Sequence, residues 1–151
     1  MRSFIQVSRD IALLLVRLVT AFILVMHGWA RYQKGPEELI NHLDALGVSA
    51  PTVVAWGTMA FELFGGLLLF CGLGTPVIGL LLLVQQVALI AIEKWEHGFL
   101  VTEGGYEYSL ALASVGALLM VFGSGRTGMD HLFMNDPIGN ERRLINDTDP
   151  A

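Results

Sequence analysis

The chain has 151 residues, of which 54% are hydrophobic and 15% charged, with a mean hydropathy of +0.59 and a formal net charge of −5. This composition is more apolar than that of a soluble domain, and the lack of basic runs interleaved with aromatic residues argues against nucleic acid as a partner. The single cysteine, Cys71, excludes an intramolecular disulfide, a Cys-x-x-Cys redox pair, a thiolate zinc site and covalent haem attachment.

The first apolar run covers residues 11–29 and is interrupted by Arg17 and His27. Its length predicts a transmembrane helix. A cleaved signal peptide is the alternative, but the residues after the run are bulky and polar and offer no small-x-small cleavage site. A second, short amphipathic helix is expected over residues 37–46. It is too short to span the bilayer, so we expect it on the membrane surface or packed on the bundle as a solvated helix.

Three more apolar runs follow, over residues 52–73, 77–95 and 107–122. The turn between the second and third runs carries no charge, which predicts that these helices are antiparallel and pack directly side by side. The fourth run is rich in small residues that allow close helix approach, and this face makes a homodimer plausible.

These patterns predict an all-α fold, an integral membrane bundle of four antiparallel transmembrane helices within residues 1–130. The short amphipathic helix lies in its first loop, and residues 131–151 are expected to form a polar, disordered cytoplasmic tail. The termini carry five arginines outside the spans and the opposite loops three basic residues, which favours cytoplasmic termini. The bilayer is the first predicted partner.

Two groups of polar residues interrupt the apolar pattern. Arg17 lies roughly 10 Å and Glu62 roughly 15 Å inside the bilayer from opposite ends of their helices. A buried charge is costly unless it is paired, so these two residues are expected to meet directly or through a glutamine of the third span. The alternative is a purely structural role in helix register. The outer group consists of His27, Arg31, Glu93, His97, Tyr106, Glu107 and Tyr108.

Other candidate residues have plainer interpretations. Gln85 is better explained as hydrogen-bonding glue between helices than as a ligand, and Gly65 and Gly66 as packing residues. His27 is more often an ordinary interface residue. The spacing of His27, Glu93, His97 and Glu107 does not demand a metal, and no metal, haem or flavin motif occurs.

Four motifs in order give the chain a resemblance to a known family. They are His27-Gly28-Trp29 at the end of the first span, Glu62-x-x-Gly65-Gly66 in the second, residues 104–108 before the fourth and Gly123-Ser124-Gly125-Arg126 after it. Over residues 11–130 the chain resembles the DoxX family of small bacterial and archaeal four-helix membrane proteins. The family usually has a lysine where this chain has Arg31, and often an arginine where it has Pro76.

The resemblance implies a multi-pass protein of the bacterial or archaeal cytoplasmic (inner) membrane. Some relatives are the membrane subunit of a thiosulfate:quinone oxidoreductase, so the first hypothesis is a component of a quinone-linked oxidoreductase system that acts on a small sulfur or thiol donor. A second membrane or soluble redox subunit is then a plausible partner. The alternatives are a non-catalytic scaffold and, third, a small-molecule transporter.

Under the first hypothesis, quinone is the expected cofactor and no metal is required. The predicted catalytic residues are Glu62, His27 and Glu107, because quinone reduction consumes protons that a buried carboxylate and a histidine can carry. The predicted substrate- or quinone-binding residues are Arg17, Arg31, Gln86, Glu93 and Tyr106.

Overall fold

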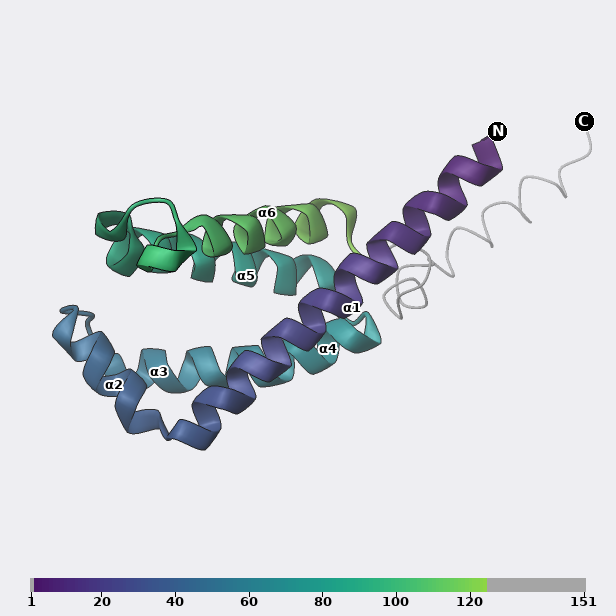
Figure 1. Ribbon diagram of the computed structural model, residues 1–151. Coiled ribbons are helices and arrows are strands. Elements are labelled where there is room, and N and C mark those ends of the chain that lie inside the picture. The colour runs from purple at the N-terminus through teal and green to yellow at the C-terminus, as the bar shows by residue number, and fades with distance from the viewer. Residues whose placement is uncertain (1, 125–151) are drawn as a thin grey trace, which may run out of the picture.

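The computed structural model describes residues 2–124, and the side chains from residue 7 onward (Figure 1). Within this range every regular element is helical. The predicted tail over residues 131–151 lies outside the described residues, as do Gly125 and Arg126 of the last motif.

The elements lie where the apolar and amphipathic runs occur. The first helix is longer than the predicted run, because its polar ends continue the same helix beyond residues 11–29. The elements are α1 (Arg2–Lys34), α2 (Pro36–Ala45), α3 (Pro51–Ala60), the π-helix η1 (Phe61–Gly65), α4 (Gly66–Cys71), α5 (Thr75–Leu89), the π-helix η2 (Ile90–Lys94), the 3₁₀ turns η3 (Trp95–His97) and η4 (Val101–Glu103), and α6 (Glu107–Phe122).

Three continuous helical segments are long and apolar enough to cross a membrane: Val7–Lys34, Pro51–Cys71 and Thr75–His97. The fourth apolar helix, Glu107–Phe122, has 16 residues. Large apolar side chains face outward along these helices, among them Phe22, Leu67 and Val121, which are 67%, 56% and 69% exposed. Such a surface is suited to lipid rather than water.

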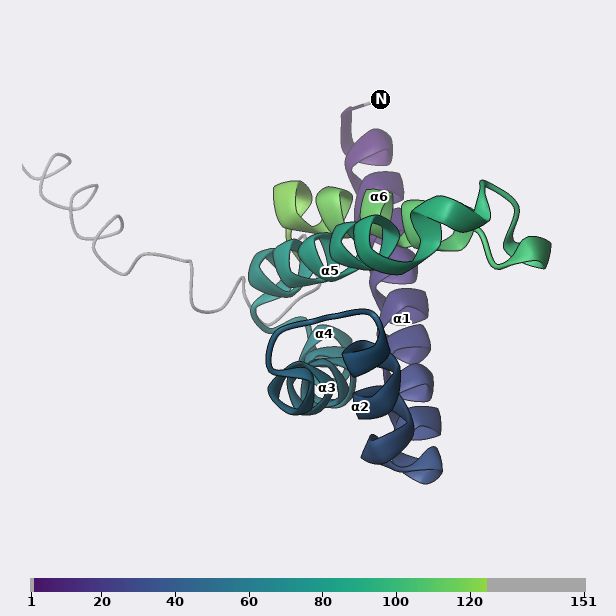
Figure 2. The same ribbon diagram turned by 90° about the vertical axis from the view of Figure 1, so that its left-hand side faces the viewer.

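The helices are arranged as two pairs. In Figures 1 and 2, α3–η1–α4 lies alongside α1, whereas α5 lies against α6, and α1 crosses both layers. The second and third apolar segments therefore do not pack along their length as expected. They touch near the Gly72–Gly74 turn, where both glycines have positive φ angles of 72° and 62°, and α5 then leaves α4 to pack on α6.

The two pairs meet in an apolar core at the end nearest this turn. Its buried members come from both pairs: Ala21, Leu24, Leu69, Ile78, Leu82 and Leu119. A Cβ on Gly79 would lie 2.6 Å from the backbone nitrogen of Met120 and 2.8 Å from the carbonyl oxygen of Gly116. Glycine at these positions therefore permits α5 and α6 to touch through their backbones. Gly116 is one of the small residues of the fourth apolar run, whose face makes a homodimer plausible. In the structure it packs against α5 of the same chain.

Candidate active site: a polar cleft between the helix pairs

Glu62 is the most deeply buried acidic side chain of the described chain, with 3% of its surface exposed. Arg31 Nη1 lies 3.2 Å from Glu62 Oε1, and Gln85 Nε2 donates a hydrogen bond of 3.2 Å to the same oxygen. The carboxylate is thus joined to α1 by an ion pair and to α5 by an amide. Charge pairing of this kind is what makes a buried carboxylate tolerable.

The local backbone positions this carboxylate. Glu62 lies in η1, a π-helical widening of an otherwise α-helical segment, and such widenings are frequent at functional sites. On the facing helix, a Cβ on Gly28 would lie 3.0 Å from Glu62 Cβ and 2.9 Å from Leu63 Cγ. Gly28 therefore lets α1 approach η1 closely, and Arg31, about one helical turn later, reaches Glu62.

Two oxygens of this cluster are buried without a hydrogen-bond partner among the described residues. They are Glu62 Oε2 and Gln85 Oε1, the oxygens left over when Gln85 donates to Glu62 Oε1. A buried acceptor without a donor is destabilising. Such groups are few in native proteins, and a catalytic role or a bound water or ion is among their explanations.

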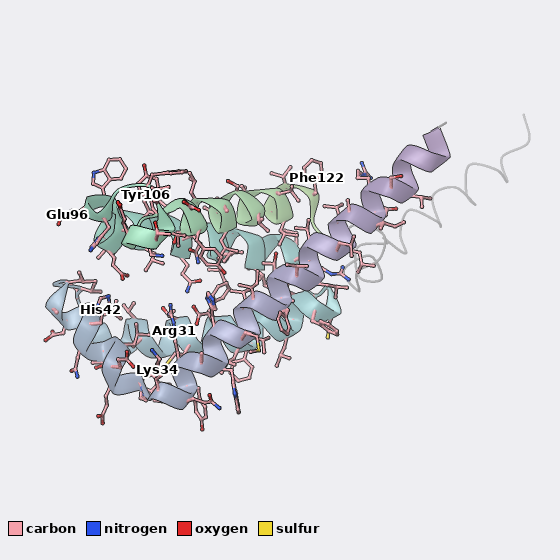
Figure 3. All side chains as sticks on the ribbon, in the orientation of Figure 1. Arg31, Lys34, His42, Glu96, Tyr106 and Phe122 are labelled. Atoms are coloured by element: carbon pink, nitrogen blue, oxygen red, sulfur yellow. The ribbon has the colours of Figure 1, made fainter. Side chains whose placement is uncertain are left out.

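The cluster lies beside a cleft of about 920 Å³ between the two helix pairs. Figure 3 shows Arg31 and His42 on the side of α1 and α2 that faces α5. One part of the lining is polar: His27, Arg31, Lys34, Glu38, His42, Thr58, Glu62, Gln85, Gln86, Glu93, Lys94, Tyr108 and Ser109. The remainder is mostly aliphatic and comes from α2, α3, α5 and η2, so the cleft is amphipathic.

Two further contacts involve η2, on the side of the cleft opposite α2. His42 Nε2 of α2 lies 3.2 Å from Glu93 Oε1 of η2, so this pair links the two sides. Lys94 Nζ donates a hydrogen bond of 3.0 Å to the hydroxyl of the buried Ser109. Glu93 and Lys94 both lie in the second π-helical segment. Each π-helix therefore places an acidic residue in the cleft.

The cleft brings together five of the eight residues predicted from the sequence. Glu62, His27, Arg31, Gln86 and Glu93 line it, and the ring of His27 lies 6.0 Å from that of Tyr108.

The other three predicted residues do not line the cleft. Arg17 is 3% exposed and donates a hydrogen bond of 3.2 Å from Nη1 to the carbonyl oxygen of Ser124. Arg31, about 21 Å further along α1, holds the position at Glu62 that was expected for Arg17. Glu107 accepts a hydrogen bond from the backbone nitrogen of Val101 at 3.3 Å. Tyr106 stacks on Trp95 and meets Phe99 edge to face in the segment between η2 and α6.

The sequence did not single out several residues that line the cleft. Lys94, Ser109 and Thr58 carried no motif, and His42 was read only as part of the amphipathic helix. The i, i+4 relation of Glu38 to Lys34 was a local signal, and these two side chains do lie 3.5 Å apart. Gln85 hydrogen-bonds between helices as expected, but its partner is the carboxylate itself. Among residues 2–124, no three His, Cys, Asp or Glu side chains are grouped closely enough to hold a metal ion.

Apolar helices of membrane length, with a polar cleft between two helix pairs, define the class: a multi-pass helical membrane protein with an internal site. The model of the DoxX family matches residues 12–95. The chain is also 32% identical over 108 residues to a protein of Bacillus subtilis (strain 168) named "Putative oxidoreductase CatD", an alignment that covers 72% of this chain and 78% of that protein. No solved structure matches the chain. The chain belongs to the DoxX family.

Proposed function

We propose that the protein is the membrane component of a quinone-linked oxidoreductase system and that its cleft binds the quinone. The single observation that carries this proposal is the Arg31–Glu62–Gln85 cluster beside an amphipathic cleft that also has aliphatic walls. A lipid-soluble molecule with a polar ring needs this combination of surfaces. The name of the Bacillus subtilis relative agrees with a redox role.

The residues of the cleft fit such a ligand. Bound quinone would accept two electrons from the donor and two protons, which come from the surrounding water when the donor is thiosulfate. Glu62 is a group that can hold and release a proton away from bulk water, and Arg31 supplies a positive charge at 3.2 Å from it. His27, Tyr108 and Lys94 add further hydrogen-bonding groups to the same lining, and its aliphatic walls can contact the apolar part of the ligand.

We propose a small sulfur anion such as thiosulfate, or a thiol, as the electron donor. Two donor molecules would join through an S–S bond and release the two electrons. Arg31, Lys34 and Lys94 line the cleft and can attract an anion. A second membrane or soluble redox subunit is a natural partner for this half of the reaction.

We further propose four antiparallel spans, with α6 as the fourth. Its length of about 24 Å is less than the roughly 30 Å of the hydrocarbon core, but it lies against α5 and is as apolar as its neighbours. Four spans place both termini on one side, and the excess of arginines there favours the cytoplasm. The membrane is then the cytoplasmic (inner) membrane of a bacterium or archaeon.

The test is the quinone content of the purified protein. The protein is prepared in mild detergent and extracted with organic solvent, and quinone is quantified against protein. We expect stoichiometric quinone in the wild type and about a tenfold loss or more in Glu62→Gln, the scale of one hydrogen bond to a charged group. Glu96→Gln removes an exposed carboxylate outside the cleft and is the matched control, expected to retain quinone.

Well-folded wild-type protein without quinone would contradict the proposal, and so would equal quinone in Glu62→Gln. Circular dichroism of each variant establishes that it is folded. In either case the non-catalytic scaffold becomes the working hypothesis, and affinity purification of partners through the outer loops is its test.

A further inference from the structure

We infer that Glu62 and Gln85 together form a proton-binding site, in which the proton lies on Glu62 Oε2 and Gln85 Oε1 accepts it. The inference deepens the proposed function and rests on it for the use of the proton. The hydrogen bonds of the two side chains define the site itself.

Both donors of the cluster converge on one carboxylate oxygen. Arg31 Nη1 and Gln85 Nε2 each lie 3.2 Å from Glu62 Oε1. Glu62 Oε2 has no hydrogen-bond partner in the described chain. The two oxygens of the carboxyl group are thus unequal, and Oε2 is the one left to bind a proton.

The leftover atom of Gln85 complements this oxygen. Gln85 Oε1 is also buried and without a donor among the described residues, and it belongs to the amide that already contacts the carboxyl group. A carboxylate and an amide oxygen are both acceptors, so neither can satisfy the other. One proton on Glu62 Oε2 makes that oxygen a donor, which can then donate a hydrogen bond to Gln85 Oε1.

The burial of these atoms favours a proton over a larger ligand. Both oxygens are closed to solvent although the cleft lies beside them. A proton occupies no volume, and it removes the charge from a carboxylate that is only 3% exposed. Gln85 is accordingly a positioning residue: it holds the carboxyl group in the orientation in which Oε2 is the protonated oxygen.

Several titratable and charged groups face this site. Arg31 of α1 contacts Glu62 directly and opposes protonation, because it stabilises the carboxylate. The same cleft is also lined by His27 and Lys34 of α1, Glu38 and His42 of α2, Glu93 and Lys94 of η2, and Tyr108 of α6. Arg31 and the hydrogen bond donated by Gln85 Nε2 stabilise the carboxylate, whereas burial and the acceptor Gln85 Oε1 favour the protonated form, so the site is suited to take up and release a proton.

The experiment is infrared spectroscopy of the full-length protein in lipid nanodiscs as a function of pH. The carboxylic-acid C=O band that is present in the wild type and absent in Glu62→Gln reports protonated Glu62. We expect this band to appear as the pH falls. In Arg31→Gln it should appear at higher pH, because a nearby opposite charge is lost.

Gln85→Leu and Gln85→Met test the positioning role. Each should move the band to higher wavenumber, because the carboxylic acid loses both hydrogen bonds to the amide. Gln33→Leu changes an exposed glutamine of α1 that does not line the cleft, and it should leave the band in place. Thermal unfolding shows that each variant is folded.

Two results would overturn the inference. One is the absence of a Glu62 acid band at every pH at which the protein is folded. The other is a band that Gln85→Leu and Gln85→Met leave in its wild-type position. A band that behaves as expected in protein that binds no quinone would refute the proposed function and leave the proton site standing.

Discussion

Two arginines of α1, one in the middle of the helix and one near its C-terminal end, are held in the protein in different ways. Arg17 and Arg31 lie on one continuous helix and both carry a guanidinium group into the protein. Arg17 is 3% exposed at the end where the two helix pairs close on an apolar core, and it donates to the carbonyl oxygen of Ser124. Arg31 lines the cleft, with its side chain 32% exposed, and pairs with Glu62.

We infer from this difference that Arg17 has a structural role and that Arg31 is accessible to a ligand in the cleft. At the closed end, backbone contacts between Gly79 and Gly116 bring α5 and α6 together. At the open end, polar contacts from Gln85 to Glu62 and from His42 to Glu93 connect the helix pairs across a cleft. A tightly packed end can hold the helices while the other end keeps space for a ligand.

The largest effect on stability is expected from adding a side-chain atom at the closest contact between α5 and α6. In Gly79→Ala, the new methyl group would lie 2.6 Å from the backbone nitrogen of Met120, so α5 and α6 must separate. We expect a loss of about 2 kcal/mol of stability, the scale of overpacking in a core. The measurement is unfolding of the detergent-solubilised protein, followed by circular dichroism.

Gly57→Ala is the matched control for this substitution. Gly57 is also in a helix, but a Cβ there has no atom within 4 Å. Its stability should therefore stay the same or rise by up to about 1 kcal/mol from helix propensity. Equal losses for the two variants would mean that the closed end is not packed as described.

A second comparison exchanges the two arginines for glutamine. Arg31→Gln should weaken quinone binding about tenfold, because it removes the charge beside Glu62. Arg17→Gln should leave quinone affinity near the wild-type value, because Arg17 lies outside the cleft lining, and its effect should appear in stability. Quinone retention and thermal unfolding of both variants check this division, and a loss of quinone with Arg17→Gln would break it.

The smallest effect is expected at the pair between His42 and Glu93. Both side chains are partly exposed, at 49% and 30%, and such pairs contribute less than about 1 kcal/mol. His42→Ala should therefore leave stability almost unchanged. It should speed the release of bound quinone, because one contact across the cleft is lost. Stopped-flow exchange against a second quinone measures this rate, and a slower release would show that the pair does not restrain the cleft.

The helices were predictable because their signal is local. Runs of apolar residues and the charge-free Gly72–Gly74 turn correctly located the helical segments, and the amphipathic pattern after Pro36 located α2. The motif that begins at Glu62 contains a residue that lines the cleft. The family assignment followed from these motifs and is confirmed.

The pairing of the helices was less predictable. Depth in ideal antiparallel spans predicts that Arg17 meets Glu62 directly or through a glutamine. Instead, α1 continues to Lys34 and crosses both layers, so a later arginine reaches the carboxylate. The two π-helical segments carried no sequence signal, yet they hold Glu62 and Glu93. The short turn before α5 suggested packing on α4, whereas Gly79 and Gly116 direct α5 to α6.

The most direct test of the central claim is to locate the bound quinone. The wild-type protein in lipid nanodiscs is labelled with a photoreactive quinone analogue, with and without excess unlabelled quinone, and the labelled peptides are identified by mass spectrometry. We predict competable labelling of the cleft-lining parts of α3–η1 and α5–η2, around Glu62 and Gln85. Competable labelling confined to the closed end around Arg17, or labelling that excess quinone does not reduce, would contradict the account.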